Sequence, residues 1–184
     1  MIKIRTLDVS DMQDVIKLKA LCWPEELAGL SFAVFDFEKE YAFWTTWMNT
    51  AKEHNDTRLL NGAFENCELL GAAFGSYAET DDIVNNSIEL NGFWVYPKHR
   101  GKGISLMLVT KILDEFYKLG MSQLVVYNFH HSSSNSFYRK FGCTVMRKDT
   151  QLEEKLPVDV FIGEISEMNC KMKAALLKYI PSGI

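Results

Sequence analysis

The sequence has few cysteines, and they show none of the spacings that hold a metal or form a redox motif. Cys22, Cys67, Cys143 and Cys170 lie far apart, with no Cys-x-x-Cys among them. This distribution predicts four reduced thiols, mostly packed as small apolar side chains. The four histidines also lack the paired spacing of metal ligands, so no metal is expected.

Long apolar runs and an excess of basic residues are missing as well. No uninterrupted apolar run approaches the length that crosses a membrane. Residues 1–5 begin a strand pattern and lack the apolar core of a signal peptide. The net charge is −4 and the isoelectric point is about 5.6. We therefore expect a cytoplasmic protein that binds neither membranes nor nucleic acids and prefers neutral or cationic partners.

The composition that remains is that of an ordinary globular protein. The chain has 184 residues, 47% of them hydrophobic and 24% charged. This length suits one full core, so residues 1–184 are expected to form a single domain. Periodicity, turn residues and caps predict the following strands and helices. The strands are expected at 2–6, 58–64, 68–77, 87–96, 123–129, 144–148 and 158–165, and the helices at 12–23, 37–53, 104–119, near 133–141, and 166–179.

Two boundary signals accompany the first helices. Residues 10–13, Ser-Asp-Met-Gln, have the pattern of a capping box, and Pro24 follows the first helix. Asp36 is the expected cap of the second helix. Later in the chain, the strand, apolar helix and strand between residues 87 and 129 predict a parallel pair with a right-handed crossover.

The most informative stretch joins the strand 87–96 to the helix that begins at Ile104. Pro97 ends the strand, and Gly101 and Gly103 allow a tight turn without a Cβ. The amides of a helix N-terminus form a cradle for phosphate oxygens. Lys98, Arg100 and Lys102 add positive charge around this cradle, which favours a nucleotide-like polyanion as the ligand. An ordinary strand-to-helix connection with a solvated basic face is the alternative.

Two better-known phosphate motifs are excluded. A Walker loop requires Gly-x-x-x-x-Gly-Lys-Ser/Thr, and the sequence contains no such run. A dinucleotide-binding Gly-x-Gly-x-x-Gly fails because residues 104–106, Ile-Ser-Leu, follow Gly103.

Residues 100–105, Arg-Gly-Lys-Gly-Ile-Ser, resemble the acyl-CoA pyrophosphate loop of the GNAT superfamily of N-acetyltransferases, Arg/Gln-x-x-Gly-x-Gly/Ala. Ser105 departs from the last position. The resemblance implies an α/β domain with a six- to seven-stranded, mostly antiparallel sheet, helices on both faces, and a splayed parallel pair that binds acyl-CoA. It implies that acetyl-CoA is the co-substrate. The cofactor contacts that it implies are Lys98, Arg100, Gly101, Lys102, Gly103, Ile104 and Ser105, together with the backbone of Phe93, Trp94 and Val95 at a bulge of their strand.

A second segment resembles the same family. Residues 137–143, Phe-Tyr-Arg-Lys-Phe-Gly-Cys, are similar to its Phe/Leu-Tyr-x-Lys-x-Gly-Phe, with Cys143 in place of Phe. The resemblance makes Tyr138 the proton donor to the leaving thiolate. His131 stands where the family has Asn, and Asn135 is the alternative for the same cofactor contact.

The resemblance also points to an acidic residue on the central strand as the base for the amine proton. Glu89 lies six residues before Val95, and an even offset on a regular strand places both side chains on one face. Apolar neighbours would raise the pKa of Glu89 toward neutrality. A surface carboxylate or a structural ion pair is the alternative for Glu89, and the pair His130 and His131 is a second candidate base.

The function implied is transfer of an acetyl group to a small-molecule or peptide amine. The segment after the first helix, with Trp23, Glu25, Glu26, Phe32, Phe35 and Tyr41, is expected to wall the acceptor site. The same residues are also compatible with ordinary core packing and an exposed helix start. Two alternatives compete with this function: a non-catalytic acyl-CoA sensor, and an enzyme with a different donor such as succinyl-CoA. The last helix either covers the sheet or mediates a homodimer.

Overall fold

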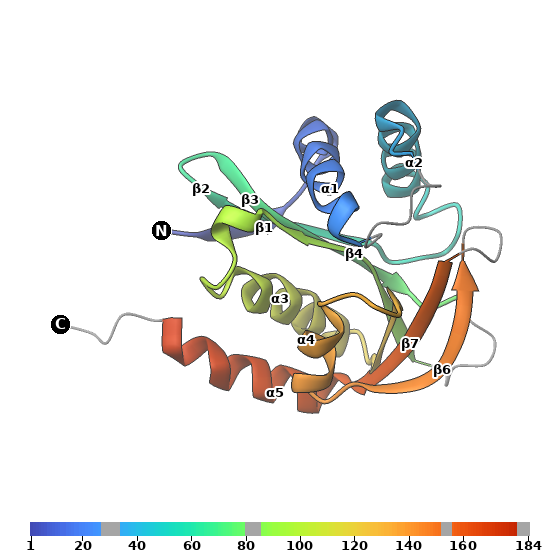
Figure 1. The fold of residues 1–184 in the computed structure, drawn as a ribbon, viewed down its shortest axis with the longest axis vertical. Coiled ribbons are helices and arrows are strands. Elements are labelled where there is room, and N and C mark those ends of the chain that lie inside the picture. Colours follow the sequence, from blue (N-terminus) through green and yellow to red (C-terminus); the bar gives the residue numbers. More distant parts are fainter. Residues whose placement is uncertain (27–33, 80–85, 152–155, 180–184) are drawn as a thin grey trace.

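The computed structural model describes residues 1–26, 34–79, 86–151 and 156–179. A seven-stranded sheet forms the centre of the molecule, in the order β1-β2-β3-β4-β5-β7-β6 (Figure 1). Neighbouring strands are antiparallel except β4 and β5, which are parallel. The strands are β1 (Lys3–Thr6), β2 (Leu59–Glu65), β3 (Glu68–Tyr77), β4 (Ser87–Val95), β5 (Gln123–Phe129), β6 (Thr144–Gln151) and β7 (Leu156–Glu164).

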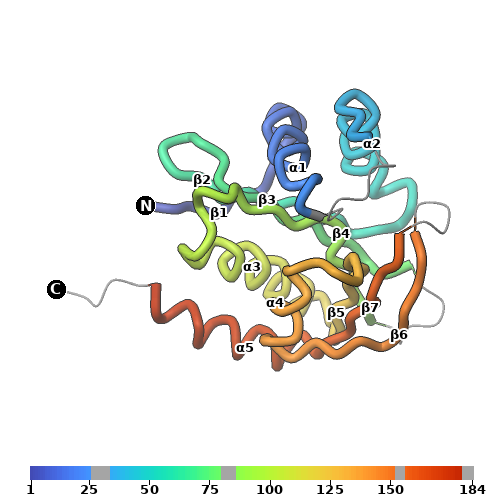
Figure 2. Tube along the Cα trace, viewed as in Figure 1, coloured from blue at the N-terminus to red at the C-terminus, as the bar shows by residue number. Residues whose placement is uncertain are grey.

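Helices cover both faces of this sheet. On one face lie α1 (Met12–Glu26) and α2 (Phe37–Asn49), and on the other lie α3 (Ile104–Lys118) and α5 (Ile165–Leu176) (Figures 1 and 2). The short α4 (Asn135–Lys140) lies beside the region where β4 and β5 separate. Of the apolar clusters among the described residues, the two largest lie under α3 and α5 and under α1 and α2. The predicted α/β architecture, with its single parallel junction, is confirmed.

The boundaries of α1 correct two predictions. The capping box before this helix is built by Asp8 and Asp11 around the 3₁₀ turn Val9–Asp11, and residues 10–13 do not form it. Pro24 lies inside α1, which continues to Glu26. A proline near the end of a helix removes one backbone hydrogen bond in the last turn, and a helix tolerates this better there than in its middle.

Other elements differ from expectation mainly in length. Asp36 caps α2 as predicted, by accepting from the Lys39 N–H, but the helix ends at Asn49. Strand β6 is longer at its C-terminal end than expected, and α5 begins at Ile165. The expected turn at 81–86 falls largely outside the described residues, as do Phe32, the loop 152–155 and Pro181. All four thiols are free, but only Cys22 and Cys143 are buried.

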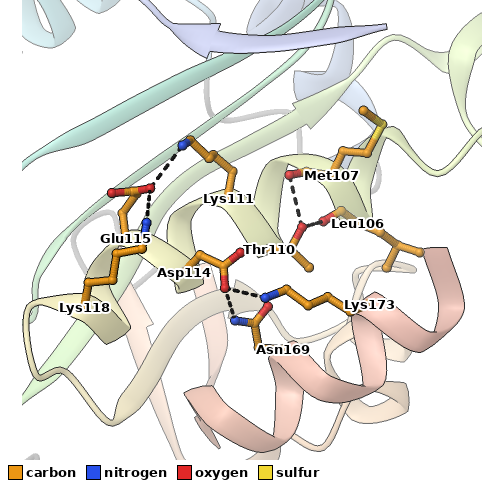
Figure 3. A network of polar contacts seen from close by, with 9 residues as sticks. All are labelled: Leu106, Met107, Thr110, Lys111, Asp114, Glu115, Lys118, Asn169 and Lys173. Carbon is orange, nitrogen blue, oxygen red and sulfur yellow. Dashed lines mark hydrogen bonds and ion pairs between the residues drawn. The ribbon is translucent and has the colours of Figure 1, made fainter. Parts of the chain in front are cut away.

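The C-terminal helix packs beside α3 and completes the core. Met168 and Met172 of α5 are fully buried in the core under α3. Figure 3 shows the polar contacts at the edge of this interface: the Asp114 carboxylate accepts from Asn169 Nδ2 and Lys173 Nζ, each at 2.6 Å. Of the two roles considered for this helix, the structure therefore shows that it covers the sheet. None of the described helices is long and apolar enough to span a membrane.

Candidate active site

The site begins where the two parallel strands separate. β4 and β5 pair only between residues 87–89 and residues 123–125. Beyond that point β4 continues against β3 as far as Val95, and β5 continues against β7 as far as Phe129. A cleft of about 340 Å³ opens between them. The described residues that line it are Cys22, Glu25, Leu90, Asn91, Gly92, Phe93, Trp94, Val95, Arg100, Ser105, Val126, Tyr127, Asn128, Ser132, Ser133, Ser134, Ser136, Phe137 and Tyr138.

A β-bulge at Asn91 changes which residues of β4 face the same way. Leu90 pairs with Gly75 and Gly92 pairs with Phe74, so Asn91 is an extra residue without its own partner on β3. Such an insertion shifts the alternation of side chains beyond it. Accordingly, Leu90 and Val95 both pack into the core under α3, although their offset is odd. The bulge thus lies earlier than the expected 93–95.

This shift overturns the sequence argument that placed Glu89 and Val95 on one face. Glu89 lies next to Leu90 on the regular part of β4, so it points away from the face that Leu90 shares with Val95. Glu89 is not among the described residues that line the cleft. Burial raises the pKa of the Glu89 carboxyl, and the negative charge of Glu79 raises it further. A hydrogen bond from the Asn91 side chain acts in the opposite direction.

The backbone of β4 offers hydrogen-bonding groups to the cleft at alternate residues. The Tyr96 N–H donates to the Leu70 carbonyl of β3 at 3.0 Å. Successive residues of a strand direct their backbone N–H and C=O groups to opposite sides. The backbone groups of Phe93 and Val95 therefore face the cleft, and those of Trp94 face β3. The Trp94 side chain is buried in the core under α1 and α2, in edge-to-face contact with Trp44 and Phe74.

The glycine loop at the start of α3 presents a row of amides that have no partner in the described ranges. Gly101 and Gly103 have φ of +76° and +78°, in the region that favours glycine. The first amide that bonds within the helix belongs to Met107, which donates to the Gly103 carbonyl at 3.0 Å. None of the amides of residues 101–106 has an acceptor within the described part of the chain. These residues fit a phosphate group, because a helix N-terminus carries both free donors and a positive dipole.

The basic side chains around this loop do not all point toward it. Arg100 reaches back over the cleft, where Nε donates to the Val95 carbonyl at 3.2 Å and Nη1 donates to Glu25 of α1 at 2.6 Å. Lys98 pairs with Glu68 of β3 at 2.7 Å. Lys102 Nζ lies 3.3 Å from His99 Nδ1 on the 3₁₀ turn before the loop. Only Arg100 of the three lines the cleft.

Tyr138 lies on the opposite wall. It comes from α4, is 4% exposed and packs its ring 5.5 Å from that of Phe161. The preceding Phe137 contacts Phe93 of β4, with ring centroids 5.6 Å apart. The structure thus brings Tyr138 into one cleft with the end of β4, Arg100 and Ser105, as the sequence predicts.

The two alternatives for a further cofactor contact, His131 and Asn135, lie outside this lining. Asn135 is buried, donates to the carbonyls of Phe129 and His130 at 3.0 and 2.9 Å, and accepts from Asn128 at 2.6 Å. Its amide therefore joins the end of β5 to α4. His131 is exposed beside Phe129.

The remaining candidates have partners elsewhere. His130, considered as a base, bonds through Nδ1 to Asp159 at 2.7 Å. Of the residues expected to wall the acceptor site, Glu25 lines the cleft. The rings of Trp23 and Phe35 contact each other edge to face, with their centroids 5.7 Å apart. No group of possible metal ligands occurs among the described residues.

Sequence reasoning missed three contributions to the cleft. Cys22 reaches it from α1, and a row of serines reaches it from the segment before α4. Local composition could have identified those serines, because small polar residues next to the expected loop stand out in the sequence. The third contribution is Asn91, which also lines the cleft. Local composition could not have identified it, because its position depends on the bulge.

Comparison with known proteins gives a consistent result. The model of the acetyltransferase (GNAT) family matches residues 13–143. No curated protein matches the sequence. The PaiA N-acetyltransferase of Thermoplasma acidophilum, solved with coenzyme A, is 20% identical with a TM-score of 0.68, over 89% of this chain and 99% of that one.

Two further solved structures share the fold. A ribosomal-protein-alanine N-acetyltransferase of Brucella melitensis is 16% identical with a TM-score of 0.66, over 88% of this chain and 99% of that one. An aminoglycoside 6'-acetyltransferase type Ii is 18% identical with a TM-score of 0.62, over 89% of this chain and 97% of that one.

Proposed function

The chain belongs to the acetyltransferase (GNAT) family, and from this premise we propose that it transfers the acetyl group of acetyl-CoA to a primary amine by direct attack in a ternary complex. The observation that carries the proposal is a single continuous site. A cleft between diverging strands contains a buried tyrosine, and Ser105 joins it to a loop whose amides have no acceptor among the described residues. Such a site accommodates a long ligand with an anionic end.

The donor would be held mainly by backbone. The amides of residues 101–106 suit its diphosphate, and the groups of Phe93 and Val95 that face the cleft suit its pantetheine arm. Acetyl-CoA supplies an activated thioester when bound. Direct attack needs no covalent enzyme nucleophile, and the residues that line the cleft would exclude bulk water around the reacting atoms.

Two side chains are assigned to proton transfer. Tyr138 would donate a proton to the departing sulfur, since it lines the cleft and is buried. Glu89 would accept the proton of the amine. Because Glu89 does not line the cleft, this proton must pass through water. The raised pKa of Glu89 brings its titration closer to neutral pH, which suits a general base.

The acceptor is proposed to be a cationic small molecule or a peptide amine. The acidic chain and the Glu25 carboxylate at the cleft favour a positively charged partner. The related structures bear the names of enzymes for a ribosomal protein and for an aminoglycoside. Their common fold therefore does not select between these acceptors.

The test is a thiol-release assay with acetyl-CoA and a panel of amines: 1,4-diaminobutane, an alanine-terminated peptide and an aminoglycoside. Release above the amine-free rate with at least one of them is the expected result. Calorimetry with coenzyme A runs in parallel. Binding of coenzyme A without thiol release on any amine would favour the acyl-CoA sensor. Faster thiol release with succinyl-CoA would identify succinyl-CoA, and not acetyl-CoA, as the donor. Absence of binding would refute the proposed site altogether.

A further inference from the structure

Three side chains form a row across the sheet on the face that α1 covers. Tyr127 of β5 and Arg147 of β6 both pair with Val160 of β7, so the three side chains lie next to one another on one face. Trp23 of α1 and Tyr127 pack against the same small apolar cluster, which identifies this face. Tyr127 also lines the cleft, and β6 is the last strand of the sheet. The row therefore runs from the cleft to the outer strand.

The residues assigned to catalysis lie on two different faces of this sheet. Tyr138 packs in the core under α3, and Ser105 lies in the first turn of α3. Glu89 pairs with Val125, two residues before Tyr127 on β5, so Glu89 shares the opposite face with Tyr127. An acceptor that approaches the thioester from the side of the proposed base would thus pass Tyr127.

Arg147 is held at the hydroxyl of Tyr127. Its Nη2 donates to that hydroxyl at 3.2 Å, and the guanidinium carbon lies 5.9 Å from the centre of the ring. The same nitrogen donates to the Asp149 carboxylate at 3.3 Å. The Arg147 side chain is 28% exposed, so solvent reaches this positive charge at the edge of the cleft.

The two groups together match the chemistry of a carboxylate. A phenol that accepts a hydrogen bond still carries its own proton to donate, and a guanidinium donates in a planar fork that fits two carboxylate oxygens. Asp149 is a weak competitor, because its side chain is 40% exposed and ion pairs of such exposure contribute little. If a ligand displaced it, Asp149 would keep the hydrogen bond from the Thr150 N–H at 2.8 Å.

We propose that Arg147 and Tyr127 bind a carboxylate of the acceptor, so that the preferred acceptor is a primary amine with a carboxylate a few bonds away. The carboxylate would be held at the row, and the amine would point into the cleft. This inference rests on the function proposed above and names the class of its acceptor. A diamino acid would combine this carboxylate with the positive charge that Glu25 favours.

The test uses amines in pairs that differ only in a carboxylate: L-ornithine against 1,4-diaminobutane, and L-alanine against ethylamine. In the thiol-release assay with acetyl-CoA, the wild type should prefer the carboxylated member of at least one pair. The expected preference is about 10–100-fold in kcat/KM, the range for hydrogen bonds to a charged group. It should arise mainly in KM for the amine, because the carboxylate is bound equally before and during the reaction.

Variants of the row separate a specific contact from a general effect of charge. Arg147→Gln should abolish the preference and leave KM for acetyl-CoA unchanged. Lys148→Gln is the matched control, since it removes the same charge from the next residue of β6, which pairs with Asp159 on the opposite face. It should leave the preference intact. Arg147→Lys keeps the charge without the fork and should retain part of the preference, even if Arg147→Gln is poorly folded.

The possible outcomes separate the explanations. Equal rates within both pairs would overturn the inference, as would a preference that persists in folded Arg147→Gln or is lost equally in Lys148→Gln. Faster reaction of 2-aminoethyl phosphate than of L-alanine would assign the row to a phosphate and overturn it as well. In each of these cases, thiol release by the wild type with any amine would still support the proposed function. Failure with every amine would overturn the function and this inference with it.

Discussion

The two glycines of the loop form a natural matched pair for a substitution experiment. Gly101 and Gly103 have nearly equal φ, +76° and +78°. A Cβ added to Gly101 would meet nothing within 4 Å, whereas a Cβ added to Gly103 would lie 2.9 Å from Cγ and Cδ2 of Tyr179. Replacing each glycine by alanine therefore imposes the same backbone strain, but only Gly103→Ala adds a collision.

The magnitudes follow from this geometry. An L-residue in the left-handed region costs about 1–2 kcal/mol, so Gly101→Ala should lower the free energy of unfolding by that amount. Gly103→Ala should lose about 1 kcal/mol more from overpacking, at the low end of the usual range because Tyr179 is 48% exposed and its side chain can turn outward. For a domain of this size, each kcal/mol corresponds to a shift in Tm of about 2–4 °C.

The assay is thermal unfolding of the two variants, combined with calorimetry of coenzyme A. Both variants should bind coenzyme A more weakly than the wild type, because strain in the loop misplaces its amides. Adding Tyr179→Ala to Gly103→Ala should recover the part of the loss that comes from the collision. Equal losses for Gly101→Ala and Gly103→Ala, with no recovery in the double variant, would refute the packing of Tyr179 on the loop.

Three further outcomes are expected. Tyr138→Phe should lower turnover about 10²–10⁴-fold with unchanged affinity for coenzyme A, and full turnover would remove Tyr138 from the mechanism. Since burial raises the pKa of Glu89, the folded state holds its proton more tightly than the unfolded state, and stability falls as pH rises through the raised pKa. Glu89→Gln should abolish both this fall and the acidic limb of the rate profile, and a retained limb would exclude Glu89 as base. Lys19→Met should lower the free energy of unfolding by about 1–3 kcal/mol, because the Glu40 side chain, only 24% exposed, loses its ion-pair partner. Denaturant titration should show recovery when Glu40→Gln is added.

Features that depend on one continuous stretch of sequence were predicted well. The glycine loop, the apolar helix α3 and the segment that carries Tyr138 depend on local turn chemistry and periodicity, and the family and the fold class deduced from them are confirmed. The class of enzyme, an acetyl-CoA-dependent N-acetyltransferase, is confirmed with them.

Features that depend on a partner strand or a distant helix were not predicted. The prediction that Glu89 shares a face of β4 with Val95 was wrong, because the bulge at Asn91 exists only in the register between β3 and β4. Pro24 looked like a helix end, yet the last turn of α1 tolerates it. A single sequence shows the spacing of residues along one strand, but it does not show where the neighbouring strand lacks a partner for one of them.

The basic cluster at 98–102 shows how tertiary contacts change the meaning of a local charge pattern. Lys98 and Arg100 are paired with Glu68 and Glu25, and in both pairs each side chain is about half exposed. Exposed pairs of this kind contribute roughly 0–1 kcal/mol, so an anionic ligand could replace either carboxylate at little cost. The amides of the loop have no such competitor among the described residues. The preference for an anion that we propose for this corner would therefore originate in the backbone around Gly103, and the lysine and arginine side chains would adjust its strength.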